Sequence, residues 1–164
     1  AESYVSADDC AAYAVSHGLL FVNDASGDSA LRRATTWLDG TYRPRFPGVR
    51  AHRRAQGLQW PRSGATDAEG NKIEADEIPR EIIAAACEAA IREYATPGAL
   101  SPDVTPGKIM TGASVTGAVS VTYKAEGGIE GQRPIATVVD DILAPLLGNR
   151  PNPRAAVVGG SARA

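Results

Sequence analysis

The sequence contains few of the residues that catalytic or metal sites require. It has two cysteines and two histidines, without the close spacing that binds zinc. A Gly-x-Ser-x-Gly nucleophile motif and a phosphate-binding loop are also absent. The carboxylates of Asp8 and Asp9, and of Asp140 and Asp141, are adjacent in sequence, so they diverge on a helix. We therefore expect no enzyme, with no catalytic residue, no metal ligand and no cofactor.

Two cysteines are also too few for a disulfide framework. Cys10 and Cys87 both fall on apolar faces of predicted helices, so we expect them to be buried free thiols. No apolar run has the length that a membrane span needs, and no signal-peptide pattern is present. The sequence therefore predicts neither a membrane segment nor a secretion signal.

Basic and aromatic residues are scarce as well. Lysine and arginine number 17 against 19 acidic residues, and aromatic residues make up 5% of the chain. Duplex binders usually carry a basic excess, and single-strand binders add aromatic side chains on which bases stack. The composition therefore disfavours a strong nucleic-acid binder. A length of 164 residues with 43% hydrophobic content predicts one domain whose core consists of Ala, Val, Ile and Leu.

The most regular pattern in the sequence predicts a central core helix at about 79–94. Pro79 suits a first helical turn, where its missing N–H is not needed. Glu81, Glu88 and Arg92 are predicted to lie on the exposed side, with Glu88 and Arg92 as a favourable i,i+4 pair. The residues predicted to form the buried face, at offsets of four, seven, eight and eleven, are Ile83, Cys87, Ala90, Ile91 and Tyr94.

Three further helices are expected. The first runs from about 6 to 17, with Ser6 as N-cap and Gly18 ending it. The second covers about 29–41, with Ser26 or Asp28 as its cap. We expect it to expose Arg32, Arg33, Thr36 and Asp39 and to bury Leu31, Ala34, Trp37, Leu38 and Tyr42. The last opens at Pro134 and ends or kinks at Pro145. We expect its buried stripe to consist of Ile135, Val138, Val139, Ile142 and Leu146.

The remaining segments predict turns, a hairpin and a tail. Leu58 and Trp60 are expected in the core, and 67–71 reads as a turn between two short strands. Alternation at Val119, Val121 and Tyr123 indicates a β-hairpin at about 108–124, which must pair or pack to be stable. The fold class is thus mainly α: a small bundle of about four helices with a β-hairpin, in a domain spanning 1–147, and an extended C-terminal tail at 148–164.

One basic segment, residues 43–54, stands out in this acidic chain. Two prolines and Phe46 indicate a shaped loop. Two interpretations are open: the loop contacts DNA or an acidic partner surface, or it is a solvated loop that balances acidic charge elsewhere. Its arginines are Arg43, Arg45, Arg50, Arg53 and Arg54.

Several motifs, taken in order, resemble a family of tailed-phage proteins. These proteins are head–tail connector adaptors, often labelled DnaT-like single-stranded-DNA-binding proteins. The similarity extends nearly to Gly148. The matching segments are ESYVS at 2–6, RRATTWLD at 32–39, QGLQWPR at 56–62, DAEG at 67–70, the start of the helix at 78–79, VSVTY at 119–123 and LAPLL at 143–147.

The resemblance implies a structural function. An adaptor of this family forms a ring, expected to be dodecameric, under the portal and joins it to the next connector, stopper or tail protein. It assembles in the host cytoplasm and resides in the neck of the virion, where DNA passes through the lumen without specific binding. We expect the hairpin residues Val119, Val121 and Tyr123 to contact the neighbouring subunit.

The C-terminal tail is implied to dock onto the portal, although a neighbouring copy of the chain could hold it instead. It has no acidic residue and few apolar ones. The expected contact residues are Arg150, Pro151, Pro153, Arg154, Val157, Val158 and Arg163. The alternative function is single-stranded-DNA binding, for which Tyr42, Phe46 and the arginines of 43–54 are the expected contact set.

Overall fold

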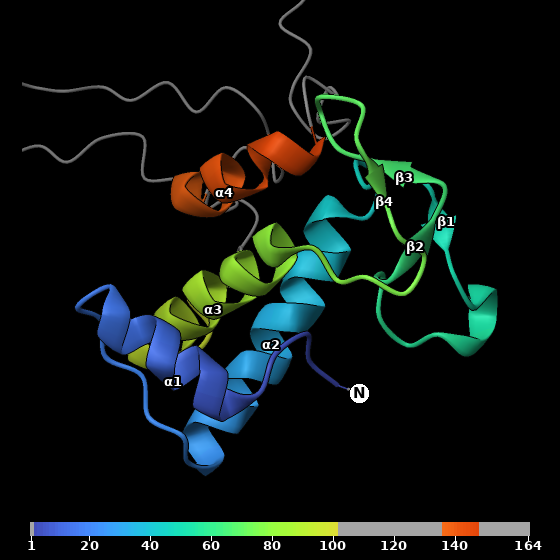
Figure 1. Cartoon of the computed structure of the whole chain (residues 1–164). Coiled ribbons are helices and arrows are strands. Elements are labelled where there is room, and N and C mark those ends of the chain that lie inside the picture. Colours follow the sequence, from blue (N-terminus) through green and yellow to red (C-terminus); the bar gives the residue numbers. More distant parts are fainter. Residues whose placement is uncertain (1, 102–135, 148–164) are drawn as a thin grey trace, which may run out of the picture.

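The structure, a computed structural model, describes residues 2–101 and 136–147 (Figure 1). Within these ranges the chain forms four α-helices: α1 (Ala7–Ser16), α2 (Ala25–Tyr42), α3 (Arg80–Ala95) and α4 (Thr137–Leu147). Two short antiparallel strand pairs lie between α2 and α3. The mainly helical bundle is therefore confirmed. The predicted hairpin at 108–124 and the tail at 148–164 lie outside the described residues.

The ends of α1 and α2 follow from local capping. Ser6 accepts from the backbone N–H of Asp9 at 3.1 Å, which confirms the predicted cap. The second helix begins four residues earlier than predicted, because Asp24 is its N-cap and accepts from the N–H of Gly27 at 2.8 Å. A side chain at Gly27 would clash, since its Cβ would lie 2.1 Å from the carbonyl oxygen of Val22.

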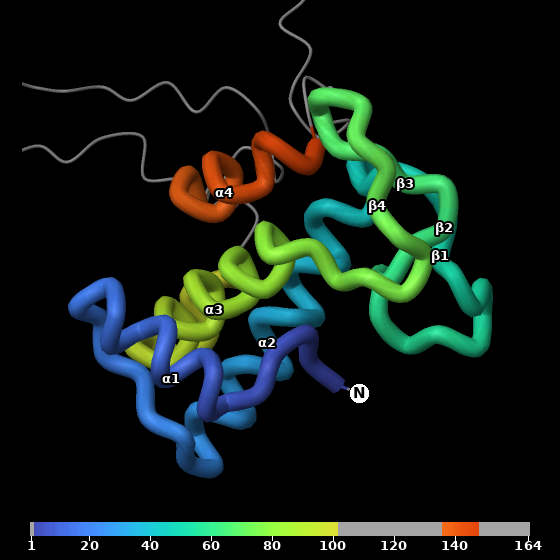
Figure 2. The backbone as a smooth tube through the Cα atoms, in the orientation of Figure 1, coloured from blue at the N-terminus to red at the C-terminus, as the bar shows by residue number. Residues whose placement is uncertain are grey.

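Helix α3 is the centre of the bundle and packs against α1, α2 and α4 (Figures 1 and 2). The predicted buried face is confirmed at Cys87, Ala90 and Ile91. It was incomplete, because packing on several sides leaves α3 without a fully solvated face. Ile82 is fully buried and Ile83 only half-buried. Glu88 is also buried rather than exposed, where it accepts from the Tyr13 hydroxyl at 3.3 Å and lies 3.8 Å from Arg92.

The remaining core is built by α2, α4 and the residues before the strands. Trp60 is 1% exposed, as predicted, and both cysteines are buried and free. The buried residues of α4 are Val139, Leu143, Leu146 and Leu147, whereas Val138 is 39% exposed. The predicted stripe on α4 was thus partly wrong, and its first member, Ile135, lies outside the described residues. Helix α4 continues past Pro145 to Leu147, and the Pro145 carbonyl accepts from the N–H of Ala68 at 2.8 Å.

The four strands form a compact lobe at 47–73, called here the β lobe, at one end of the helices (Figure 1). Strand β1 (Val49–Arg50) pairs with β2 (Arg62–Ser63), and β3 (Ala65–Thr66) pairs with β4 (Lys72–Ile73). Between β3 and β4, the Asp67 carboxylate accepts from the N–H groups of Glu69 and Asn71, at 2.9 and 2.8 Å. The predicted turn between two short strands is therefore confirmed.

Candidate functional site

A buried polar hub joins three segments that are far apart in the sequence. The Tyr4 hydroxyl donates to Asp39 and accepts from the N–H of Gln59 at 3.0 Å. The same N–H also donates to Asp39 Oδ2 at 3.0 Å. Burial, together with the nearby Asp39 carboxylate, raises the pKa of Tyr4, and burial raises the pKa of Asp39. The hub corrects the prediction that Asp39 is exposed, and it attaches the β lobe to α2 and to the N-terminal segment.

Arg62 connects the two segments that lead into β1 and β2 of the β lobe. Its side chain is buried and donates to the carbonyl oxygens of Pro47 at 2.6 Å, Gly48 at 2.7 Å and Gln59 at 3.2 Å. Gly48 has a φ of +66°, and a Cβ there would lie 2.5 Å from the carbonyl oxygen of Ser63. Only glycine therefore permits this close approach. Burial lowers the pKa of Arg62, and the carbonyl oxygens solvate its charge.

The arginines of the predicted basic segment divide into two groups. Arg45 is half-buried and lies 3.4 Å from Asp140 of α4, and Arg50 donates to the Gln56 carbonyl oxygen at 3.0 Å. Arg43, Arg53 and Arg54 are exposed. The structure therefore uses Arg45 and Arg50 internally, and leaves the other three arginines of the segment for contact with a partner or solvent.

The loop that presents Arg53 and Arg54 is braced from inside. Gln56 Nε2 donates to the carbonyl oxygens of Leu58 and Pro61, at 2.9 and 3.0 Å, and Gln56 Oε1 accepts from the N–H of His52 at 3.1 Å. A short 3-10 helix, Arg53–Ala55, follows, with Arg53 at a φ of +50°. Non-glycine residues adopt this conformation rarely and only where the surroundings hold them there. The loop is thus a shaped surface.

The aromatic residues expected to stack bases are buried, so that prediction was wrong. Tyr42 is 3% exposed and donates to Asp140 Oδ1 at 2.9 Å, because α4 packs over it. Phe46 is 6% exposed, with its ring 5.8 Å from the ring of Trp60. Both rings serve the core, and neither is available to a ligand.

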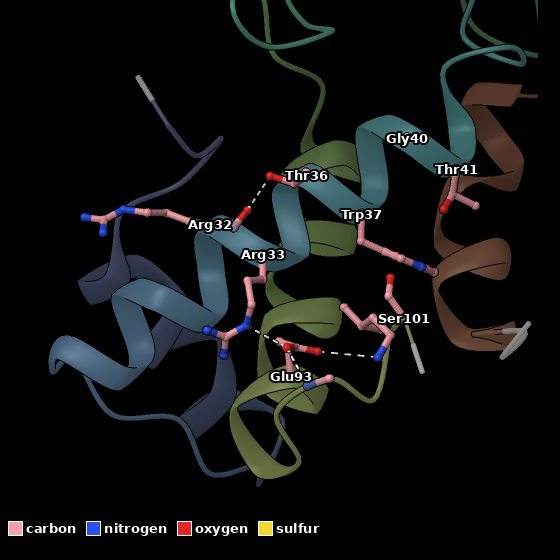
Figure 3. A pocket seen from close by; sticks show the side chains of 10 residues that line it. Arg32, Arg33, Thr36, Trp37, Gly40, Thr41, Glu93 and Ser101 are labelled. Atoms are coloured by element: carbon pink, nitrogen blue, oxygen red, sulfur yellow. Dashed lines mark hydrogen bonds and ion pairs between the residues drawn. The ribbon is translucent and has the colours of Figure 1, made fainter. Parts of the chain in front are cut away.

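A pocket that the sequence analysis missed lies on α2, beside the segment that follows α3 (Figure 3). Its volume is about 650 Å³. Trp37, which was expected to be buried, is only half-buried and forms part of the wall. The i,i+4 spacing of Arg33 and Trp37 is the sequence signal that could have placed them together. The main contributors are Arg32, Arg33, Thr36, Trp37, Leu100 and Ser101.

Glu93 organises one wall of this pocket. Its buried carboxylate accepts from Arg33 Nε at 2.7 Å and from the N–H groups of Gly98 and Leu100, at 2.7 and 3.4 Å (Figure 3). Burial by itself favours the neutral acid, but the three hydrogen bonds together outweigh it and lower the pKa of Glu93. The carboxylate therefore stays charged and is neutralised by its donors.

Residues 2–101 and 136–147 contain no cluster of His, Cys, Asp and Glu that could hold a metal ion. The same residues include no helix that is long and apolar enough to cross a membrane. Two of the predicted contact sets fall outside these ranges. They are the hairpin residues Val119, Val121 and Tyr123 and the tail residues between Arg150 and Arg163.

The chain was compared with known families, curated proteins and solved structures. No curated protein and no solved structure matches it significantly. The family model described as "Putative DnaT-like ssDNA binding protein" matches residues 1–159. Because this match spans nearly the whole chain, the protein belongs to that family.

Proposed function

We propose that this chain is a structural head–tail adaptor of a tailed phage or phage-like particle, which forms a ring under the portal and joins it to the next connector or tail protein. The polar hub is the observation that carries the proposal. Tyr4, Asp39 and Gln59 come from three of the motifs on which the resemblance rests. These motifs fix the β lobe on the helices, which is what a rigid building block needs.

Exposed apolar residues support a role in assembly. Val15, Leu19, Leu20 and Val22 lie within eight residues at the end of α1 and after it, and Val15 and Leu20 are 76% and 74% exposed. Apolar groups gathered on a surface are typical of protein contacts. At the other end of the bundle, the braced loop presents Arg53 and Arg54.

The adaptor proposal is tested by deleting the chain after Leu147. The truncated protein should keep its melting temperature as a monomer, because the deleted tail has too little apolar surface to contribute to the core. It should lose co-sedimentation with portal rings, where many tails bind together. If the full chain does not bind portal rings, the adaptor proposal is wrong. Undiminished binding by the truncated protein would instead assign docking to the basic loop.

The second candidate function is binding of single-stranded DNA. The family description favours it, and the family match supports it more directly than the adaptor function. Arg43, Arg53 and Arg54 could contact phosphates without sequence preference. With Tyr42 and Phe46 buried, this loop by itself has no stacking platform and should bind weakly.

Fluorescence anisotropy with a labelled single strand at physiological salt tests this candidate. The double variant Arg53→Gln, Arg54→Gln removes two exposed charges, whereas Arg50 is left in place because it braces the loop. Arg80→Gln is the matched control, since this arginine is 94% exposed on α3. Tight binding that the double variant loses and the control keeps would support DNA binding, and absence of binding would exclude it.

A further inference from the structure

Trp37 is the aromatic side chain that the described residues offer to a ligand in the pocket on α2. Its indole is half-buried, whereas Trp60, Tyr42 and Phe46 are buried in the core. The Tyr42 ring meets it edge-on at 5.9 Å and braces it from one side. Figure 3 shows the indole projecting from α2 on the side where Ser101 lies. One aromatic surface is thus held in place at the wall of a pocket.

The lining of the pocket contains two arginines, Arg32 and Arg33, and one carboxylate, Glu93, so it has one excess positive charge. Arg33 donates through Nε to Glu93 at 2.7 Å, and its side chain is still 49% exposed. Arg32 lies beside it and pairs with Glu2 at 2.8 Å, with side chains 56% and 77% exposed. Such exposed ion pairs contribute little to stability, so Arg32 can leave Glu2 for another anion at little cost. Glu93 is the acidic residue in the lining, and three donors already neutralise it.

The pocket also has the necessary room. A volume of about 650 Å³ falls within the range of small-molecule sites. Gly40 leaves the α2 side open, because nothing lies within 4 Å of where its Cβ would be. Arg43, eleven residues after Arg32, extends the basic face of α2 by roughly 16 Å at about 1.5 Å per residue.

We propose that this pocket holds a base of a single-stranded nucleic acid, stacked on Trp37, with the adjoining phosphates on Arg32 and Arg33. An indole next to guanidinium groups is the combination that single-strand binders use without sequence preference. The proposal rests on the second candidate function and assigns its contact to α2 rather than to the loop at 43–54.

Tryptophan fluorescence of the full chain, titrated with oligodeoxythymidine, tests the assignment. Trp60 is 1% exposed, so a quenched signal reports Trp37. Trp37→Leu should remove the quenching and weaken binding roughly tenfold in anisotropy, the loss typical of one stacked base. Arg32→Gln should weaken binding severalfold and reduce its salt dependence. Arg80→Gln should change neither, and melting temperatures show that each variant is folded.

Three outcomes overturn the assignment. If the chain binds the strand but Trp37→Leu and Arg32→Gln bind as well as the unaltered chain, DNA binding stands and the site lies elsewhere, most directly at Arg53 and Arg54. If polyglutamate quenches Trp37 and competes with the strand equally, the pocket recognises acidic protein segments. If the unaltered chain binds no strand at all, the second candidate function fails together with the assignment.

Discussion

At the residue scale, Tyr4 provides one hydroxyl that two segments depend on. Replacing it with phenylalanine leaves Asp39 and the N–H of Trp60 without this partner in a buried site. A buried group that loses its hydrogen bond costs about 1–3 kcal/mol. We expect Tyr4→Phe to lower the free energy of unfolding by that amount, measured by urea denaturation.

Tyr13→Phe is the matched control for Tyr4→Phe. The Tyr13 hydroxyl is half-buried and bonds Glu88 at 3.3 Å, a longer contact, so its loss should cost less than 1 kcal/mol, about the net value of a typical hydrogen bond. Equal effects of the two substitutions would show that the hub is not a special point of attachment.

Glu93 predicts a dependence of stability on pH. Hydrogen bonds hold its pKa in the folded state below the ordinary value of 4.5, so the unfolded state binds a proton more readily. The stabilisation is present above that ordinary pKa and is lost as the pH falls through the lower, folded pKa. Glu93→Gln should reduce stability by about 1–3 kcal/mol at pH 7. The difference in free energy of unfolding between this variant and the unaltered chain should become smaller at acidic pH.

Urea denaturation of both proteins between pH 7 and pH 3 measures this prediction. A second comparison with Glu81→Gln controls for the loss of one charge on α3, since Glu81 is paired with the exposed Arg80. The role given to the carboxylate charge would be contradicted if Glu93→Gln and the unaltered chain differed in free energy of unfolding by the same amount at every pH.

At the element scale, the burial of α3 distinguishes two neighbouring isoleucines. Ile82 is completely buried among the other helices, with 0% of its surface exposed to solvent. Ile83 is only half-buried and lies beside the segment at 3–9. Ile82→Ala should cost about 2–5 kcal/mol, because it leaves a cavity in a packed core. Ile83→Ala should cost clearly less, and thermal or urea denaturation measures both.

The sequence pattern predicts the reverse order, since it placed Ile83 on the buried face of α3. A larger effect at Ile83 would therefore favour the sequence-based face over the packing in the structure. The two substitutions remove the same atoms from the same helix, so helix propensity cancels between them.

At the scale of the whole molecule, the two thiols report how the bundle opens. Cys10 of α1 and Cys87 of α3 are 0% and 1% exposed. A thiol reagent should modify both slowly in the native protein, and the rate should rise with urea together with global unfolding. Rapid modification of Cys10 with Cys87 still protected would show instead that α1 detaches as a separate unit.

The arrangement of the whole molecule also explains why only some of the arginines at 43–54 are exposed on the surface. Arg45 and Tyr42 both contact Asp140, which lies almost one hundred residues later in the chain. Arg50 turns inward to Gln56, and Arg62, which the sequence analysis gave no role, is buried as a clamp. What remains exposed is a small basic surface on a braced loop.

The sequence by itself determined the features that depend on neighbours in the chain. Ser6 and Gly18 bound α1, Asp67 closes the turn between β3 and β4, and Pro79 precedes α3. Capping and turn formation involve groups within about four residues, so local sequence contains the necessary information. The mainly helical fold class follows from the same local signals together with helical periodicity.

Only the tertiary structure decided which polar groups are buried and which aromatic is available. Glu88 and Glu93 are buried because other elements cover α3 on several sides. Tyr42 cannot contact a ligand because α4 packs over it. Trp37 faces a pocket because the segment after α3 returns to α2 through Glu93. Each outcome depends on contacts between residues that are distant in sequence, and periodicity along one helix cannot specify how many neighbours will cover it.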